Sequence, residues 1–547
     1  MTLEVISNED MRRLHEASLT ILEEVGIRVH HGPTVQLLAD AGATVVTERD
    51  LRLPAAMVER AIEQAGKQHI LYGRDRERQA RFGHGRPNAL SNAGEYAWVD
   101  PVKRTRRNPV TDDVRAAIRV GDALSGIDIV GSMAAPTDEP MEIRDIVAHR
   151  ELIVGTTKPC AAWIRNGETA RVIIEMFEAL RGGAEALRQF PPIEGFIEPV
   201  SPLQFRRESL EILAEFARAG LPVGFGPMVI CGSSGPVTLA GTLAQENAEI
   251  LAGIVISQLL RPGLPVTYWG IPHILDPATA NMVFGGPEQG LMAAAITQLG
   301  RRYGLPVGVN VGLTDAKVPD AQAGLEKGMT LLMGALAGAD IFGHLGIAGM
   351  DQGSCLAQLI IDNEMLGHAR RTLRGITIDD RSLALDVIRQ VGPGGNYLAE
   401  EHTARSFRGE FFFPSLLDRN QWETWVAQGG TTMLDRALAT QQRILATHEV
   451  PAPDADVLAE VDAIVDRARR TVAPTMGYLG GVHQCTSAFC RPFSCRPAAW
   501  HLAPGPGRAT RSPRGRCRCS SMKCQSSLRW MHQRRSASRW RTRGTHV

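Results

Sequence analysis

The chain has 547 residues, 44% of them hydrophobic, and a formal net charge of +1. This length exceeds one ordinary domain and is ample for a large core. The charge is unevenly distributed, because residues 482–547 contain Arg and Lys but no Asp or Glu, so the remainder is net negative. Nothing in a mildly acidic body of this kind suggests a nucleic-acid-binding surface, so we expect no nucleic-acid partner.

The first 85 residues predict an N-terminal helical region. Apolar residues recur at helical spacing up to Gly26, at Met11, Leu14, Leu19, Leu22 and Val25. A second helix is predicted over residues 33–41, and a third begins at Pro54, because proline is favoured in the first turn of a helix.

From about residue 125, short apolar runs alternate with longer stretches of helical period. The predicted strands are 127–133, 158–164, 193–198, 223–231, 266–271, 307–311 and 341–345. The predicted helices are 141–154, 168–181, 206–219, 238–260, 285–303, 320–337 and 356–371. Apolar strands that each precede a helix are typical of a parallel sheet buried on both faces. Seven such units, with room for one more, favour an α/β fold of the (β/α)8 TIM-type barrel over residues 86–400.

A doubly wound open sheet is the alternative fold. It is disfavoured because no predicted strand is followed by a glycine-rich nucleotide-binding loop. After Gly392 the chain becomes helical again, which predicts a C-terminal helical region over 401–475.

Residues 476–547 differ in composition from everything before them. They lack amphipathic periodicity and acidic residues, and are rich in Arg, Ser, Pro and Cys. A basic nucleic-acid arm and a cysteine-rich metal knuckle are alternatives, but the segment has no C-x-x-C pair. We therefore expect a disordered, non-native tail without a function, such as an out-of-frame extension.

Cysteine usage and apolar run lengths predict a cytoplasmic protein with no membrane partner. The body contains three isolated cysteines, Cys160, Cys231 and Cys355, which fits a reducing compartment. The N-terminus carries acids where a signal peptide needs a basic start. The longest apolar run ends at Arg261, far short of the roughly 20 residues of a membrane span.

Barrel enzymes place their functional side chains at the carboxyl ends of strands and in the loops that follow. This rule predicts three catalytic residues, Asn310, Asp315 and His344. It predicts five substrate-binding residues, Tyr96, Trp163, Glu198, Trp269 and Lys317. The alternatives are that both tryptophans pack in the core, and that the loop holding Asp315 is solvated, with Asp320 capping the next helix.

The predicted mix of aromatic rings and carboxylates suits one kind of ligand. A quaternary ammonium group has diffuse charge and no hydrogen to donate, so aromatic faces and a carboxylate can bind it. A zinc site built from Cys231, Cys355, His273 and His344 is the competing idea. These residues lack short-range partners, so we predict no metal in this chain.

Several segments also carry a resemblance to a known family. They are 14–26, Ser201-Pro-Leu, 235–249, Thr314-Asp-Ala-Lys, 320–324, Gly392-Pro-Gly-Gly and Glu401-His-Thr. In this order they resemble the trimethylamine methyltransferase (MttB-like) family of corrinoid-dependent methyltransferases, over about residues 5 to 470. The resemblance implies a barrel that transfers a methyl group to the cobalt of a corrinoid (cobalamin). A cognate corrinoid protein supplies this group, so no cofactor is bound tightly here.

One departure from the family bears on the substrate. Trimethylamine-using members contain pyrrolysine, whereas this sequence has only the standard residues. A quaternary ammonium leaves as a neutral tertiary amine without further activation, so we expect a betaine-like quaternary amine or a methylamine as substrate. A barrel lyase or aldolase with Lys317 as Schiff base, and a non-catalytic amine-binding protein, are the alternatives. We also expect a homo-oligomer.

Overall fold

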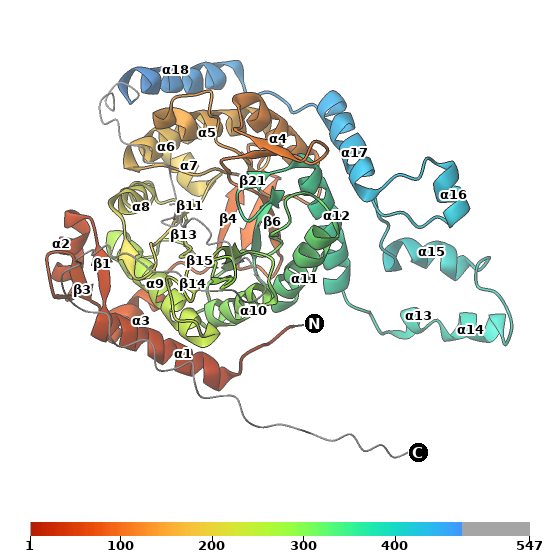
Figure 1. Cartoon of the computed structure of the whole chain (residues 1–547), viewed down its shortest axis with the longest axis horizontal. Coiled ribbons are helices and arrows are strands. Elements are labelled where there is room, and N and C mark those ends of the chain that lie inside the picture. The colour runs from red at the N-terminus through yellow and green to blue at the C-terminus, as the bar shows by residue number, and fades with distance from the viewer. Residues whose placement is uncertain (1, 473–547) are drawn as a thin grey trace, which may run out of the picture. The chain divides into compact units, whose positions relative to one another are not determined.

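A parallel sheet of six strands forms most of a barrel at the centre of the chain. The computed structural model describes residues 2–472 (Figure 1). Neighbouring strands of this sheet pair in parallel, in the order β11, β13, β15, β18, β19, β6. Their bounds are Gly195–Ile197, Val223–Phe225, Val266–Gly270, Val307–Val309, Ile341–Leu345 and Asn88–Ser91, respectively.

Two short strands close the barrel between β6 and β11. β9 (Val130–Gly131) pairs in parallel with β10 (Cys160–Ala161). Leu90 of β6 forms a parallel bridge with Ile129, and the backbone N–H of Cys160 donates to the carbonyl of Pro192 at 3.1 Å. Eight parallel strands therefore surround one axis. The predicted (β/α)8 barrel is confirmed, and the open sheet is wrong.

A helix follows every barrel strand, and seven of the eight lie close to the predicted bounds, whereas α4 was not predicted. These outer helices are α4 (Thr111–Ala123), α5 (Arg144–Gly155), α6 (Gly167–Arg181), α8 (Arg207–Ala219), α9 (Leu239–Leu260), α10 (Pro287–Arg302), α11 (Ala321–Ala337) and α12 (Leu356–Leu373). Local signals set their ends. Asp320 caps α11 by accepting the N–H of Ala323 at 3.0 Å, as predicted, and the left-handed Gly338 ends it.

The first barrel strand, β6, escaped the sequence analysis. Its sequence, Asn-Ala-Leu-Ser, is short and has no apolar run. The Asn88 side chain donates to the carbonyls of Arg81 and Asp340, which ties the strand into place. Consequently the strand–helix repeat begins with β6 and not near residue 125, and Tyr96 follows the first barrel strand.

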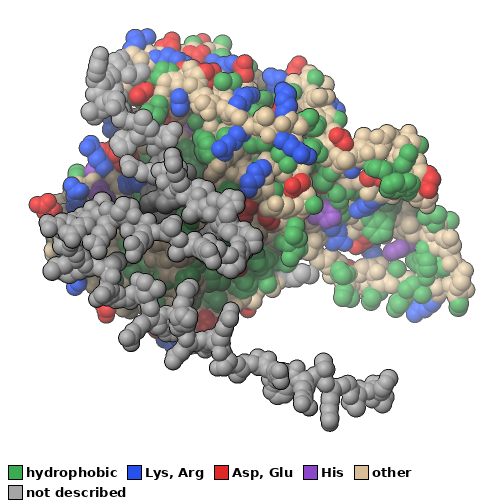
Figure 2. Space-filling model, in the orientation of Figure 1, with side chains coloured by type: hydrophobic (Ala, Val, Ile, Leu, Met, Phe, Trp, Pro, Cys, Tyr) green, Lys and Arg blue, Asp and Glu red, His purple; other side chains and the backbone are tan. Residues whose placement is uncertain are grey.

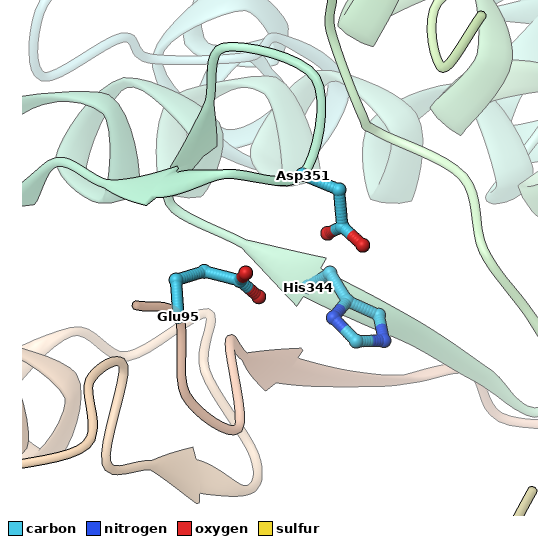
Figure 3. A group of neighbouring side chains, drawn as sticks. All are labelled: Glu95, His344 and Asp351. Atoms are coloured by element: carbon cyan, nitrogen blue, oxygen red, sulfur yellow. The ribbon is translucent and has the colours of Figure 1, made fainter. Parts of the chain in front are cut away.

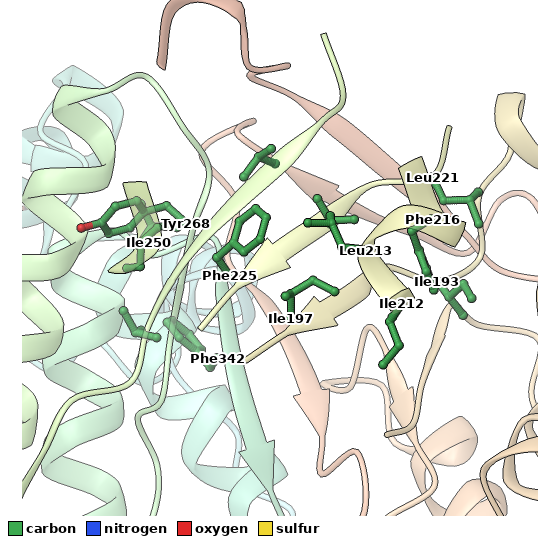
Figure 4. Close-up of a cluster of buried hydrophobic side chains, with 14 of the residues drawn as sticks. Ile193, Ile197, Ile212, Leu213, Phe216, Leu221, Phe225, Ile250, Tyr268 and Phe342 are labelled. Carbon is green, nitrogen blue, oxygen red and sulfur yellow. The ribbon is translucent and has the colours of Figure 1, made fainter. Parts of the chain in front are cut away.

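The hydrophobic core lies between the barrel strands and the outer helices (Figure 4). Ile197 and Phe225 of the strands pack with Leu213 and Phe216 of α8. Close packing there needs glycine, because a Cβ at Gly195 would lie 2.7 Å from the Phe216 ring. Burial of such side chains is the main favourable term in folding.

One indole fills the middle of the barrel interior. Trp269 of β15 is 3% exposed, and the two strands that pair with β15 carry glycine beside its ring. A Cβ at Gly224 would lie 2.5 Å from this ring, and one at Gly308 would lie 2.3 Å from it. The indole Nε1 donates to Glu194 at 3.4 Å. Trp269 therefore packs in the core, which is the alternative to its predicted role in substrate binding.

Other elements flank the barrel. The helices predicted near the N-terminus are present as α1 (Asn8–Thr20), α2 (Gly32–Asp40) and α3 (Ala55–Gln64). α17 (Met433–Thr447) and α18 (Ala455–Thr471) return to pack on the outer helices. No helix within residues 2–472 is both long and apolar enough to cross a membrane. The predicted tail, 476–547, lies outside the described residues.

Candidate functional site

Two carboxyl groups and an imidazole meet at the carboxyl ends of the barrel strands. Glu95 follows β6, His344 belongs to β19, and Asp351 lies in the turn between β20 (Ile347–Ala348) and β21 (Gly353–Ser354). Figure 3 shows these side chains pointing toward one another from separate segments. One ligand atom from each lies within 4.8 Å of the others. We call these three residues the mouth cluster.

An unusual backbone conformation presents the mouth cluster. His344 and Asp351 have φ values of 67° and 57°, in the left-handed region that side chains rarely adopt. Such residues cost about 1–3 kcal/mol each and persist only where the surrounding structure fixes them. Here the turn is fixed by N–H groups of Gly349 and Met350, which donate to the carbonyls of Ala316 and Thr314.

A buried ion pair holds the loops on either side of the cluster. Lys327 of α11 lies 2.9 Å from Asp362 of α12, and both side chains are fully buried. The Lys327 ammonium also donates to the carbonyl of Gly312, after β18. Asp362 accepts the N–H of Gly346, after β19, at 2.7 Å. The pair therefore fixes the two segments that flank His344.

The acidic groups of the site have raised pKa values. Burial and repulsion from Asp351 raise the pKa of Glu95 well above its usual value, and raise the pKa of Glu198 to about 7. Burial also raises the pKa of Asp351, which the imidazole of His344 partly offsets. Burial lowers the pKa of His344. A cation bound among these groups would favour their ionised forms.

Buried polar atoms around the mouth have no hydrogen-bond partner within residues 2–472. They are His344 Nδ1, Asp351 Oδ1, Asn310 Oδ1, His273 Nε2 and Gln289 Oε1. An unsatisfied buried polar atom costs about 1–3 kcal/mol, so such a group indicates a ligand position. In addition, no salt bridge joins Glu95, Glu198 or Asp351 to a Lys or Arg within residues 2–472, although the charge of Arg206 partly offsets the raised pKa of Glu198.

Aromatic rings connect the barrel interior with the mouth. Trp163, after β10, is 40% exposed, and its ring centroid lies 6.4 Å from that of His344. Its Nε1 donates to the carbonyl of Gly94 at 2.7 Å, which fixes the ring beside the mouth cluster. Phe196 of β11 lies edge-on between Trp163 and Trp269, with 5.6 Å between centroids on either side.

The structure brings several of the predicted residues together. Trp163 and His344 face each other, and Glu198 lies near enough to Asp351 for their charges to interact. Asn310 Oδ1 lies 3.7 Å from where a Cβ on Gly343 would stand, beside His344. Tyr96 is next to Glu95 in the chain and is mostly exposed.

Three predicted residues lie apart from the mouth cluster. Trp269 lies below it, in the barrel interior, with its indole on Glu194. Asp315 accepts the N–H groups of Phe284 and Gly285, so it holds a neighbouring loop. Lys317 is exposed, and its ammonium donates to the carbonyl of Asp315. An exposed lysine lacks the apolar surroundings that Schiff-base chemistry requires, which removes the basis of that alternative.

Sequence reasoning missed Glu95, Asp351 and Phe196. Glu95 was overlooked because β6 was not recognised as a strand, although the segment Gly94-Glu-Tyr was noticed for its tyrosine. Asp351 stands in Gly-Met-Asp-Gln-Gly directly after a strand, where paired glycines signal a tight turn at the mouth.

The mouth cluster has the donor set of a hard divalent cation, with two carboxylates and one imidazole. A zinc site with thiolates is not assembled, because no group of three potential ligands within residues 2–472 includes a cysteine. Cys231 Sγ instead donates to the hydroxyl of Thr242, and Cys355 is fully buried.

The chain is similar to known proteins over nearly all of its described length. It is 31% identical to the glycine betaine methyltransferase of Desulfitobacterium hafniense (strain Y51), covering 86% of this chain and 98% of that one. It is also 31% identical to the trimethylamine methyltransferase MttB of Desulfitobacterium hafniense (strain DSM 10664 / DCB-2), covering 84% and 93%. The solved monomethylamine methyltransferase MtmB of Methanosarcina barkeri aligns with 85% of this chain and 88% of its own, at a TM-score of 0.49 and 12% identity. Residues 1–473 match the family described as Trimethylamine methyltransferase (MTTB), so the chain belongs to this family of methyltransferases.

Proposed function

We propose that the chain removes a methyl group from a quaternary ammonium compound and transfers it to the cobalt of a corrinoid carried by a separate protein. The observation that carries this proposal is the convergence of Glu95, Glu198 and Asp351 beside the exposed ring of Trp163. Relatives that are named as glycine betaine and trimethylamine methyltransferases support the reaction class.

The reaction requires no proton transfer by an acid or base of the protein. The methyl carbon accepts an electron pair from reduced cobalt, and the C–N bond breaks with its pair going to nitrogen. The leaving group is a neutral tertiary amine, so no proton moves. The side chains therefore bind the cation, orient one methyl group toward the open mouth and exclude water.

Recognition follows from charge and shape. A quaternary ammonium has no N–H, so it cannot satisfy acceptors by hydrogen bonding, and it is attracted by net negative charge and aromatic faces. Ionisation of Glu95, Glu198 or Asp351 provides the charge within the mouth. Trp163 provides the ring face, because its indole N–H already donates to the carbonyl of Gly94 and fixes the ring.

The orientation of the substrate rests on the unpartnered polar atoms. His344 Nδ1 and Asn310 Oδ1 stand at the same end of the barrel and have hydrogen-bonding capacity left over. A substrate hydroxyl can donate to Asn310 Oδ1, and a substrate carboxylate can accept from His344 Nδ1 when that nitrogen carries the ring proton, while the ammonium group faces the acids. In this proposal Asn310 and His344, which the sequence predicts to be catalytic, instead position the substrate.

The decisive experiment mixes the protein with reduced cobalamin and a series of amines, and follows the absorbance of methylcobalamin. We expect methyl transfer from glycine betaine, choline or tetramethylammonium, and less from trimethylamine, whose leaving group needs activation. Formation of methylcobalamin from none of the quaternary amines would contradict the proposed reaction.

Binding is tested separately by calorimetry. Trp163→Leu keeps apolar bulk but removes the ring face, so affinity for the preferred amine should fall about tenfold, equivalent to ~1.4 kcal/mol. Trp422→Leu, an exposed tryptophan far along the chain, is the matched control. Unchanged affinity in the Trp163 variant would refute the cation site. Tight binding of Mn²⁺ that excludes the amine would instead identify the mouth cluster as a metal site.

A further inference from the structure

The segment between α12 and α17, residues 375–431, has almost no buried side chains. We call this segment the arm. It contains α13 (Asp380–Leu383), α14 (Leu385–Val391), α15 (Glu401–Glu410) and α16 (Trp422–Ala427). None of these four helices has a buried residue. Figure 2 shows hydrophobic side chains gathered on the surface of this segment, at the right of the view.

The arm is attached to the barrel at one place. Phe412 packs on His368 of α12 with 4.5 Å between ring centroids, and Glu364 accepts the N–H and hydroxyl of Ser415. The next residue, Leu416, is buried, and its carbonyl accepts from Arg436 of α17. The apolar residues on either side of this attachment are left in solvent.

The exposed apolar surface of the arm is large, and its residues come from the whole length of the segment. Twelve large hydrophobic side chains of the arm are exposed: Ile376, Ile378, Leu383, Leu385, Ile388, Tyr397, Leu398, Phe411, Phe413, Leu417, Trp422 and Val426. Leu398 is 83% exposed and Trp422 is 70% exposed. Together they offer on the order of 1,000 Å² or more, which exceeds the roughly 800 Å² per partner of a stable protein interface.

We propose that the arm is the interface through which two copies of this chain form a symmetric dimer. Aromatic and branched aliphatic residues in such number are typical of permanent homodimer interfaces, which resemble a divided core. A twofold arrangement lets each arm cover the same surface of the other, so the exposed residues of both copies are buried together.

The position of the arm argues against the corrinoid protein as its occupant. α12 begins at the mouth, and Arg370, near its other end, pairs with Asp128 just before β9 at 2.7 Å. The arm therefore begins at the end of the barrel opposite the mouth cluster. A methyl acceptor must reach the mouth and depart again after each transfer, whereas a permanent apolar interface suits a second copy. Only this step of the argument rests on the proposed function.

Sedimentation of the full chain tests the dimer. We expect the wild type at micromolar concentration to have twice the 59.4 kDa mass of one chain. Leu398→Glu combined with Trp422→Glu should halve this mass, because four carboxylates would enter each apolar interface. Val25→Glu, at a position that is 66% exposed on the N-terminal region, is the matched control and should leave the mass unchanged.

The monomer should keep its barrel, since both substituted side chains contact mainly solvent. Circular dichroism and a cooperative thermal transition check this in the double variant, and Ile376→Glu provides an independent single substitution. A wild type that sediments at 59.4 kDa would overturn the proposal. So would a folded double variant that remains a dimer.

Discussion

Glu198 at the barrel mouth is expected to reduce the stability of the unliganded protein. Burial and repulsion from Asp351 raise the pKa of this carboxyl from 4.5 to about 7. Between these values the folded state holds a proton that the unfolded chain has lost, so the contribution of this group to stability falls as pH rises from about 4.5 to 7. Glu198→Gln removes the charge and keeps the shape of the side chain.

The size of the effect follows from the shift. Each pKa unit corresponds to about 1.4 kcal/mol, which sets a ceiling of ~3 kcal/mol at pH 8. Because the carboxyl keeps some solvent contact, we expect Glu198→Gln to gain about 1–3 kcal/mol at pH 8 and less than ~1 kcal/mol at pH 5.

Urea unfolding at pH 5 and pH 8, without amine, measures the difference. Glu48→Gln, an exposed glutamate on a surface loop, is the control and should change stability at neither pH. An equal gain for Glu198→Gln at both pH values would show that charge burial is not the cause. A loss at pH 8 would refute the reasoning altogether.

Three other outcomes are expected. Amine affinity should rise up to about tenfold from pH 6 to 8 as Glu198 ionises, and calorimetry in two buffers of different ionisation enthalpy should show proton release on binding. An affinity that stays constant over this range would contradict this prediction. Trp269→Leu should lower stability by about 2–4 kcal/mol through the space left in the barrel, whereas Trp163→Leu should cost less than ~1 kcal/mol; equal losses would show that Trp269 is not part of the core. Lys327→Met should lower the free energy of unfolding by about 3–5 kcal/mol, because Asp362 remains buried without its partner. Adding Asp362→Asn should recover part of this stability, and a loss below ~1 kcal/mol in Lys327→Met would argue against the buried pair.

Most of the barrel was predictable because its signals are local. Apolar runs such as Val266–Gly270 and glycine-terminated helices such as α11 carry their conformation in a few adjacent residues. β6 lacks this property, since Asn88–Ser91 has no apolar run and is placed by its pairing with β19 and by the hydrogen bonds of Asn88 to Arg81 and Asp340. A strand defined by its neighbours has no signature in its own sequence.

The site was less predictable for a related reason. His344 and Trp163 lie near strand ends, and the barrel rule selected them. Glu95 and Asp351 gain their importance from convergence across more than 250 residues of sequence, which no spacing reveals. The raised pKa of Glu198 likewise depends on Asp351, which belongs to a different loop.

The single indole in the barrel interior has a consequence for how such a protein can change its substrate. Most barrels fill the interior with layers of branched side chains from several strands, so making room there requires coordinated replacements. Here the two strands that pair with β15 present Gly224 and Gly308 to the Trp269 ring, which is the largest side chain in a cluster with Leu90, Ile129 and Ile341. A smaller residue at this one position would free much of the volume of the indole beside these glycines without requiring a change in the strand backbone. Under the proposed function, one substitution at Trp269 is therefore the change most suited to admitting a bulkier amine, at a cost in stability that another part of the fold must offset.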